Sequence, residues 1–490
     1  MTNLTDLTLN ECLTGLEQKK FSSVELVSAC LKRSESLQPS LNAFTEITSG
    51  LALEQAKRAD ATRAQGERKP LLGLPIAIKD VIVTKGVRTT CASKILANFI
   101  PPYSATVIEK LEDAGAVIIG KTNMDEFAMG SSNEHSAFGA VKNPWDLNRV
   151  PGGSSGGSAA VVAARCAPVS LGTDTGGSIR QPASLTGIVG LKPTYGRVSR
   201  YGLIAFASSL DQIGPFTRSV EDSAIILETL AGHDPRDSTS APLEVPRYRD
   251  AATTRSLKGL RIGIPKEYFI GGLQPEVQKS VGVALETLRS LGATTVDISL
   301  PHTDAGVAVY YIVASAEASS NLARFDGVRY GHRSSHAEDL HELYANSRSD
   351  GFGAEVKRRI LIGTYVLSSG YYDAYYIQAQ KVRALVADDF TKAFSSHCDV
   401  IACPVAPTTA FPIGEKSNDP LSMYLNDVFT IPTNLAGLPG MSLPCGFDGK
   451  GLPIGLHVIG KHFDESSLFR VGAAYQATTT WHTSSPKLIG

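Results

Sequence analysis

Two closely spaced clusters rich in glycine and serine constrain the fold of this chain more than any other feature. They are GGSSGGS (152–158) and GTDTGGSIR (172–180), and the apolar runs AAVVAA (159–164) and APVSL (167–171) lie between them. A solvated linker would not need such runs, which predict a buried helix and a buried strand. The glycines are therefore expected in tight turns inside a core, where backbone approaches a ligand closely. Such a place can hold a serine nucleophile and stabilise an oxyanion.

Two familiar loop motifs compete with this interpretation. The first cluster satisfies G-x-S-x-G in two frames, but the elbow of the α/β-hydrolases requires a strand directly before its serine. Here the preceding segment 143–151 holds two prolines among polar residues, which favours a turn. A phosphate-binding P-loop is excluded, because neither cluster contains Gly-Lys followed by Ser or Thr.

A serine nucleophile also needs a base, and the segment GLPIAIKD (73–80) offers Lys79. Its apolar residues read as a buried strand that ends at this lysine. Burial disfavours the charged ammonium, so Lys79 can serve as a neutral base. A lysine at a strand end is ordinarily a solvated cap. The nearby serine clusters favour the catalytic role.

Together, Lys79, GGSSGGS and DTGGSIR resemble the amidase signature family, and the similarity extends over nearly the whole chain. The resemblance implies an α/β fold, an α/β/α sandwich whose large mixed β-sheet is flanked by helices on both faces. It also implies a Ser-cisSer-Lys triad, with Ser178 as the nucleophile, Ser154 as a bridge that follows a cis peptide bond, and Lys79 as the base. The implied oxyanion hole consists of the N–H groups of Thr175, Gly176, Gly177 and Ser178.

Within that family, the stretches 316–327, 351–359 and 423–427 resemble the glutaminase subunits of tRNA-dependent amidotransferases. The resemblance implies hydrolysis of glutamine and transfer of the ammonia to a partner. That partner would use ATP to convert Glu-tRNA(Gln), and alternatively also Asp-tRNA(Asn), to the amidated form. The implied partners are a tRNA-binding B subunit with kinase and transamidase activity and a small C subunit. ATP and Mg²⁺ are expected in the B subunit, and no cofactor or metal in this chain.

The same resemblance implies a pocket for free glutamine. Arg359 would bind the α-carboxylate and Asp427 the α-ammonium, and an arginine suits the first role because its planar fork meets a carboxylate with two hydrogen bonds. Because Arg358 adjoins Arg359 and Tyr311 adjoins Tyr310, the sequence leaves the choice between these neighbours open. The complete implied set is Met129, Ser131, Tyr310, Arg359 and Asp427.

Two functions of other kinds remain open from the sequence. A stand-alone amide hydrolase acting on small amides would use the same triad. A catalytically silent scaffold subunit is the other possibility, and the intact Lys79, Ser154 and Ser178 argue against it.

Length alone suggests about three domains for 490 residues. We predict a single domain over 1–490 instead, because the triad before residue 180 and the pocket beyond residue 300 would share one site. Its expected parts are a helical N-terminal part (1–64), the amidase signature core (65–230), a surface connection (231–259) and the remainder of the sheet with the substrate pocket (260–490).

Local signals predict alternating helices and strands. Capping-box spacings, Thr8 with Glu11 and Ser22 with Glu25, predict two early helices. Further along, the pattern predicts a helix over 105–114, stopped by Gly115, and strands over 116–120 and 260–265. Such alternation is α/β order, with helices expected on both faces of a sheet.

The 47 basic and 48 acidic side chains give a net charge of −1, too neutral for a protein that grips nucleic acid over its whole surface. Contact with tRNA is therefore expected mostly through the B subunit. The first 11 residues have neither a basic run nor an apolar core, and no apolar stretch approaches the roughly 18 residues of a membrane span. We expect a cytoplasmic protein without membrane contact.

Cysteine and histidine patterns indicate no metal site. The seven cysteines form no C-x-x-C pair, and Cys403 and Cys445 are expected as small buried side chains. His332, His336 and His341 lack an H-E-x-x-H spacing and are expected on a solvated face. His457 stands in an apolar run and is expected in the core.

Overall fold

The structure is a computed structural model that describes residues 3–269 and 271–487. Both predicted capping boxes are confirmed at the start of the chain. The Thr8 side chain accepts from the Glu11 N–H, and the Glu11 carboxylate accepts from the Thr8 N–H; Ser22 and Glu25 repeat this arrangement. Each box satisfies backbone donors that the first turn of a helix leaves free.

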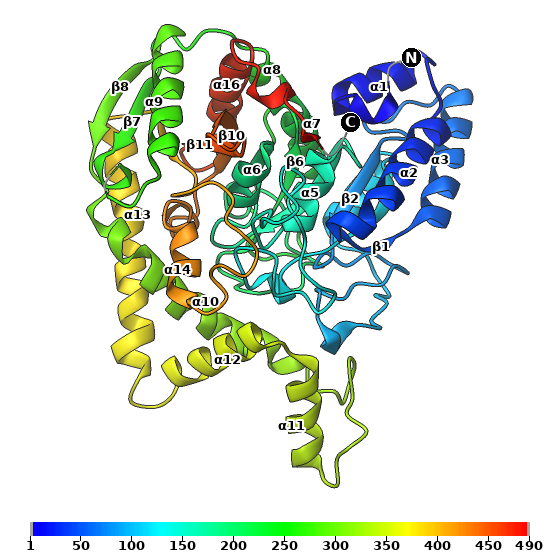
Figure 1. Cartoon of the computed structure of the whole chain (residues 1–490), viewed down its shortest axis with the longest axis vertical. Coiled ribbons are helices and arrows are strands. Elements are labelled where there is room, and N and C mark those ends of the chain that lie inside the picture. Colours follow the sequence, from blue (N-terminus) through cyan, green and yellow to red (C-terminus); the bar gives the residue numbers. More distant parts are fainter. Residues whose placement is uncertain (1–2, 270, 488–490) are drawn as a thin grey trace.

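Within the described residues, 11 strands form one mixed sheet (Figure 1). β2 runs parallel to β3 and β4, and β7 runs parallel to β8 and β9, whereas the other neighbours are antiparallel. In sheet order the strands are β1 (Phe44–Ile47), β3 (Val117–Thr122), β2 (Pro75–Lys79), β4 (Val169–Asp174), β6 (Gln212–Thr217), β5 (Val189–Lys192), β10 (Gly440–Phe447), β11 (Pro453–Ile459), β9 (Val400–Pro404), β7 (Arg261–Pro265) and β8 (Thr294–Ile298).

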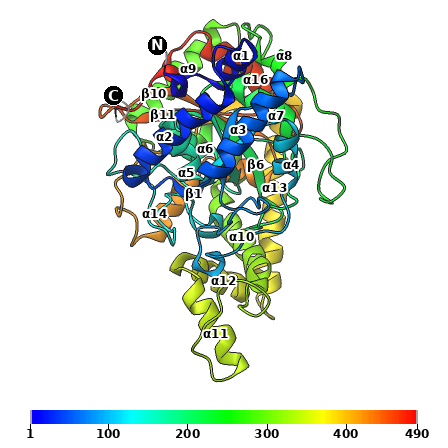
Figure 2. The same ribbon diagram turned by 90° about the vertical axis from the view of Figure 1, so that its right-hand side faces the viewer.

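Helices cover both faces of this sheet, which confirms the predicted α/β fold class (Figures 1 and 2). Phe216 of β6 joins an apolar cluster with α5 and α6, whereas Ile213 of the same strand joins the large core that includes α7 and α16. Side chains three residues apart on a strand point to opposite faces. The helices are α1 (Leu9–Glu17), α2 (Ser23–Leu41), α3 (Ser49–Ala64), α4 (Thr106–Asp113), α5 (Gly156–Ala163), α6 (Arg180–Thr186), α7 (Val220–Leu230), α8 (Tyr248–Ala252), α9 (Pro275–Ser290), α10 (Gly306–Asn321), α11 (Leu340–Gly351), α12 (Ala354–Val366), α13 (Gln378–Ser396), α14 (Pro420–Tyr424), α15 (Ile431–Leu435) and α16 (Glu465–Gln476).

The elements predicted from local pattern are confirmed to within about two residues. The expected helix over 105–114 is α4, and the expected strands over 116–120 and 260–265 are β3 and β7. Gly115 follows α4 with φ of +86°, a left-handed conformation that glycine adopts without a steric penalty. The apolar runs between the two clusters form α5 and β4, both fully or almost fully buried.

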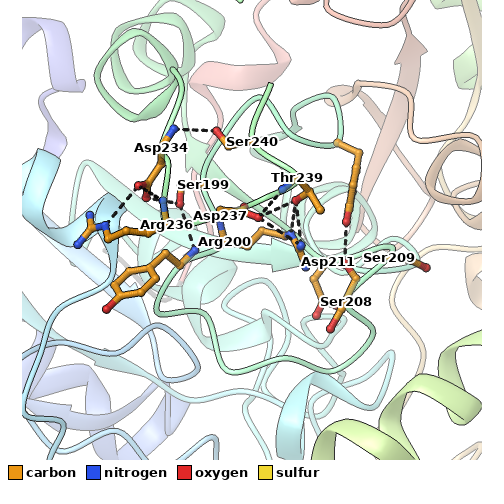
Figure 3. A network of polar contacts seen from close by, with 12 residues as sticks. Ser199, Arg200, Ser208, Ser209, Asp211, Asp234, Arg236, Asp237, Thr239 and Ser240 are labelled. Atoms are coloured by element: carbon orange, nitrogen blue, oxygen red, sulfur yellow. Dashed lines mark hydrogen bonds and ion pairs between the residues drawn. The ribbon is translucent and has the colours of Figure 1, made fainter. Parts of the chain in front are cut away.

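Two segments differ in detail from their sequence description. The N-terminal part is helical but also contributes the short strand β1, which pairs with β3. The segment 231–259 contains α8 and a polar network (Figure 3). In this network the buried Asp237 accepts from the N–H groups of Arg200 at 2.8 Å and Thr239 at 3.0 Å. The bond from Arg200 fastens the connection to the rest of the fold, and the bond from Thr239 shapes the connection itself.

Four helices of the second half, α10, α12, α13 and α15, pack together. α10 packs against α12, α13 and α15, while α11 projects from the main body (Figures 1 and 2). Among residues 3–269 and 271–487, no helix combines the length and the hydropathy that crossing a membrane requires.

Candidate active site

The sheet brings Lys79 and the two clusters together at the carboxyl-terminal ends of two neighbouring strands. β2 ends at Lys79, and its parallel neighbour β4 ends at Asp174, so the second cluster leaves the sheet beside the lysine. The first cluster leads into α5, which packs on β4. The topology of the sheet thus joins segments that lie about 75 to 100 positions apart in the chain.

Hydroxyl groups surround the amine of Lys79, which is fully buried. Its Nζ lies 2.8 Å from each of Ser154 Oγ, Ser155 Oγ and Thr173 Oγ1. The two serines come from the first cluster and the threonine from the second. The structure therefore places the predicted base in contact with the predicted bridging serine.

Burial lowers the pKa of Lys79 from its ordinary value to about 7, although the nearby carboxyl groups of Asp125, Asp174 and Asp211 oppose the shift. Loss of hydration penalises the ammonium more than the neutral amine. Near neutral pH a large fraction of this lysine is therefore unprotonated and able to accept a proton.

The hydroxyl bonds limit which group can give a proton to the neutral amine. Ser155 Oγ donates to the carbonyl oxygen of Thr173 at 3.0 Å, so it meets Lys79 as an acceptor. A neutral amine donates two hydrogens and accepts one. Ser154 and Thr173 are therefore the two hydroxyls that can donate to Nζ.

The loop that carries Ser178 is held by the carboxylate of Asp174. This buried group accepts from the N–H groups of Gly177 at 2.9 Å and Ile179 at 3.2 Å, on either side of the serine. Arg180 in turn donates to both oxygens of Asp174, from Nε at 2.9 Å and from Nη2 at 3.0 Å. Burial alone would raise the pKa of Asp174, but the charge of Arg180 holds it well below its usual range.

His457 supports the same arginine from the core. Its Nε2 lies 3.0 Å from Arg180 Nη1, and burial and the arginine charge lower its pKa well below the usual value. A neutral ring accepts the guanidinium hydrogen through Nε2. The predicted core position of this histidine is confirmed, as are the buried positions of Cys403 and Cys445.

The first cluster is tied to the second across the site. The peptide bond between Gly153 and Ser154 is cis, as the family resemblance implied. Gly153 N–H donates to Gln181 Oε1 at 3.1 Å, and Gln181 Nε2 donates to the carbonyl oxygen of Ser131 at 2.9 Å. Gln181 lies on α6, which follows the second cluster. Its side chain therefore links the first cluster to Ser131, in the segment of the expected substrate pocket.

The backbone donors around Ser178 are not equivalent. The N–H of Gly177 is already bonded to Asp174. In the part of the chain that the structure describes, the N–H groups of Thr175, Gly176 and Ser178 have no hydrogen-bond partner. Of the four N–H groups expected in an oxyanion hole, these three are available to a ligand.

Two charged atoms without partners lie in the expected glutamine pocket. Among the described residues, no hydrogen-bond partner reaches Arg359 Nη1 or Asp427 Oδ1, although both atoms are buried. The other Asp427 oxygen bonds to the hydroxyl of Ser131. Burial raises the pKa of Asp427 to about 7, and the Ser131 hydrogen bond opposes this shift. Unpaired buried polar atoms are costly, so such a pair indicates a place for a ligand with charges of both signs.

The structure distinguishes the neighbours that the sequence left open. The Arg359 side chain is 2% exposed, whereas that of Arg358 is 45% exposed. Both contact Glu355, and Arg359 Nε donates to it at 2.7 Å. Tyr310 lies against the loop that carries Ser178, since a Cβ at Gly176 would come within 2.9 Å of its hydroxyl.

Tyr311 and the first pocket segment complete the surroundings of Arg359. The guanidinium carbon lies 4.3 Å from the centre of the Tyr311 ring, so this tyrosine stacks on the arginine. Ser131 and Arg359 line the same narrow crevice. Met129 is fully buried two residues before Ser131.

Sequence reasoning missed several residues that build the site. Asp174, Thr173 and Ser155 lie inside the clusters that it identified, but nothing in a glycine-serine pattern reveals their partners. Asp125 lies six residues before the predicted pocket residue Ser131, and it accepts from the Asn133 N–H at 2.9 Å beside the first cluster. In residues 3–269 and 271–487, no three His, Cys, Asp or Glu side chains are arranged to hold a metal ion.

Known proteins of one family resemble this chain over nearly its whole length. Residues 25–469 match the model of the amidase family. The A subunit of glutamyl-tRNA(Gln) amidotransferase from Pelobacter propionicus is 61% identical over 481 residues, which cover 98% of this chain and 99% of that protein. The protein of the same name from Geobacter metallireducens is 59% identical over 480 residues, with 98% and 99% coverage. The solved structure of the A subunit from Thermotoga maritima has a TM-score of 0.81 and 42% identity, and the match covers 99% of this chain and 98% of that one. The chain therefore belongs to the amidase family, as its sequence predicted.

Proposed function

We propose that this chain is the glutaminase subunit of a tRNA-dependent amidotransferase, equivalent to the A subunit of its relatives. The observation that carries the proposal is the buried Lys79 amine, held among hydroxyls at 2.8 Å with a pKa of about 7. Arg359 and Asp427 support it, because each has a buried atom without a hydrogen-bond partner among the described residues. The relatives that share about 60% of their residues over their full length are named as the A subunit of glutamyl-tRNA(Gln) amidotransferase, which supports the same function. The amide donor would be free glutamine.

In the proposed first half-reaction, Ser178 Oγ attacks the side-chain amide carbon of glutamine. A serine hydroxyl is a weak nucleophile at neutral pH and must lose its proton as it attacks. Ser154 accepts that proton and passes its own to the neutral Lys79, with which it already makes a hydrogen bond. The tetrahedral oxyanion receives hydrogen bonds from the N–H groups of Thr175, Gly176 and Ser178.

Collapse of the tetrahedral intermediate breaks the carbon–nitrogen bond. The protonated Lys79 returns its proton through Ser154 to the departing nitrogen, which leaves as ammonia. Water then attacks the ester on Ser178, and glutamate is released. The sum of the two half-reactions is glutamine plus water to glutamate plus ammonia.

The ammonia would serve a partner that holds an activated aminoacyl-tRNA. In this proposal the B subunit binds tRNA, ATP and Mg²⁺ and amidates Glu-tRNA(Gln), with Asp-tRNA(Asn) as an alternative further substrate, while the small C subunit completes a cytoplasmic complex. The near-neutral charge of this chain agrees with a minor role in tRNA contact.

The test replaces the nucleophile. Ser178→Ala should abolish glutaminase activity while thermal stability and copurification of the partners are unchanged, because one hydroxyl is lost. A serine-directed phosphonate should label the wild type at Ser178, as peptide mapping would show. Labelling at Ser155 would contradict the triad. If the protein purified without partners and preferred other small amides to glutamine, the result would instead support a stand-alone hydrolase.

A further inference from the structure

A buried carboxylate stands behind the nucleophile loop and has no place in the mechanism above. Asp211 directly precedes β6, whose first residue pairs with Asp174 at the end of β4. Its side chain is buried and accepts the hydroxyl hydrogen of Thr175 at 2.7 Å. The carboxylate therefore reaches the nucleophile loop from the neighbouring strand.

Asp211 is itself held in one orientation. Its Oδ2 accepts from the N–H groups of Phe206 at 3.0 Å and Ala207 at 3.1 Å, which leaves Oδ1 directed at Thr175. Three donors on two oxygens define both the position and the plane of a carboxylate. A rotation that released Thr175 would also break the backbone bonds.

Residues that follow Ala207 are fastened to two long helices. Ser209 Oγ donates to Glu317 of α10 at 2.6 Å, and Arg383 of α13 donates to Ser209 Oγ at 2.8 Å. Arg200 donates to the carbonyl oxygen of Ser208, and Figure 3 shows Ser208, Ser209 and Asp211 within the same polar network. The segment that precedes Asp211 is thus bonded to both α10 and α13.

Thr175 connects Asp211 to the proposed oxyanion hole. Its hydroxyl is bonded to Asp211, while its own N–H is among the three without a partner in the described residues. On the other side, the Thr430 hydroxyl donates to the carbonyl oxygen of Gly176 at 2.7 Å. Fixing the Thr175 side chain and the Gly176 carbonyl fixes the direction of the Gly176 N–H, which lies between them in the backbone.

We propose that Asp211 is a positioning residue for catalysis, which holds Thr175 so that the backbone donors of the nucleophile loop face the developing oxyanion. The inference rests on the proposed glutaminase function. Donors contribute most when they are aligned before the reaction begins, because no reorganisation is then needed. Misalignment should weaken transition-state binding and leave the binding of the glutamine α-groups intact.

The experiment measures glutamine hydrolysis by the complex purified with its partner subunits. Asp211→Asn and Thr175→Val should each lower kcat by about 10- to 100-fold, since a small misplacement of catalytic groups has effects of this size. KM should change by less than about threefold, because Arg359 and Asp427 are untouched. The double variant should be no slower than the slower single variant, because both changes remove one shared contact. Thr175→Ser keeps the hydroxyl and should retain most of the rate.

A binding measurement distinguishes positioning from a merely structural role. The probe is the glutamine analogue with a boronic acid in place of the amide, which forms a tetrahedral anion on a serine. Its Kd should rise in Asp211→Asn by about the same factor as kcat falls, whereas the Kd of glutamate should stay within about threefold.

Asp448→Asn is the matched control. Asp448 also accepts from one threonine hydroxyl, at 2.8 Å from Thr409, and from two backbone N–H groups, but it lies in the turn between β10 and β11. This variant should keep the wild-type kcat. Wild-type kcat in Asp211→Asn, additive losses in the double variant, or an unchanged boronate Kd would overturn the inference. The proposed function itself would fail separately, if the wild-type complex did not hydrolyse glutamine or Ser178→Ala remained active.

Discussion

Arg359→Met should remove recognition of glutamine without removing the fold. The guanidinium is buried, with one nitrogen bonded to Glu355 and another without a partner among the described residues. Methionine keeps much of the apolar stem that packs beneath Tyr311. Glu355 would keep its contacts with Arg358 and with the Tyr424 hydroxyl, so the change leaves no protein carboxylate unpaired.

The expected fall in kcat/KM follows from the negative charge of the glutamine α-carboxylate, which would lose its partner. In the variant the α-carboxylate of glutamine would enter a buried site without its partner. Removing one member of a buried ion pair costs about 3–5 kcal/mol. At about 1.4 kcal/mol for each factor of ten, kcat/KM for glutamine should fall by roughly two to three and a half orders of magnitude.

The assay compares two routes in the assembled complex. Transamidation is measured with glutamine and with ammonium chloride as nitrogen donor, and only the glutamine route should be lost, because free ammonia bypasses the pocket. Arg358→Met is the matched control, since this neighbour contacts the same Glu355 but is 45% exposed. It should stay within about threefold of the wild type, as exposed ion pairs contribute little. Equal loss of both routes in Arg359→Met, or an equal defect in Arg358→Met, would refute the assignment.

Three further results are expected. The acid limb of kcat/KM for glutamine should have a midpoint near pH 7, because the pKa of Lys79 is about 7. Only the neutral amine, present above that pH, accepts a proton. Lys79→Arg should be inactive across the whole pH range. Asp427→Asn should weaken glutamine binding by at least tenfold, measured as KM, with the ammonia route retained. Glu126→Gln should raise Tm at pH 8 but not at pH 5, measured by calorimetry. Burial raises the pKa of Glu126 to about 7, so the wild-type fold binds more protons than the unfolded chain between about pH 4.5 and 7 and loses stability as the pH rises through that range.

Local sequence patterns predicted the elements that carry the proposed catalytic residues. Lys79 follows an apolar run and Ser178 lies in a glycine-rich turn, so strand, turn and helix could be predicted from patterns within about ten residues. Family resemblance then assigned roles to them. The parallel pairing of β2 with β4, which brings Lys79 beside Thr173, depends on contacts that no local pattern contains.

The choice between adjacent residues also depended on tertiary structure. Arg358 and Arg359 have the same chemistry, and only the packing of α12 buries the second and leaves the first in solvent. Asp211 gave no signal at all, because an aspartate before a strand is common in turns. Its role follows from the hydrogen bond with Thr175, which lies in the loop directly after the neighbouring strand β4.

The carboxyl groups around Lys79 explain how a buried lysine can be both neutral and functional near pH 7. Burial favours the neutral amine, but a base must also take up a proton before it can return one to the leaving group. Asp125, Asp174 and Asp211 raise the pKa of Lys79 from across the site, against the effect of burial. Each of them is also fixed by backbone N–H groups of a loop: Asp125 at Asn133, Asp174 at Gly177, and Asp211 at Phe206. Because the same bonds shape the loops around the serines and hold these carboxylates near Lys79, replacing one of the three should alter both the loop geometry and the pKa of Lys79, whereas Thr175→Val removes a loop contact and keeps the charge.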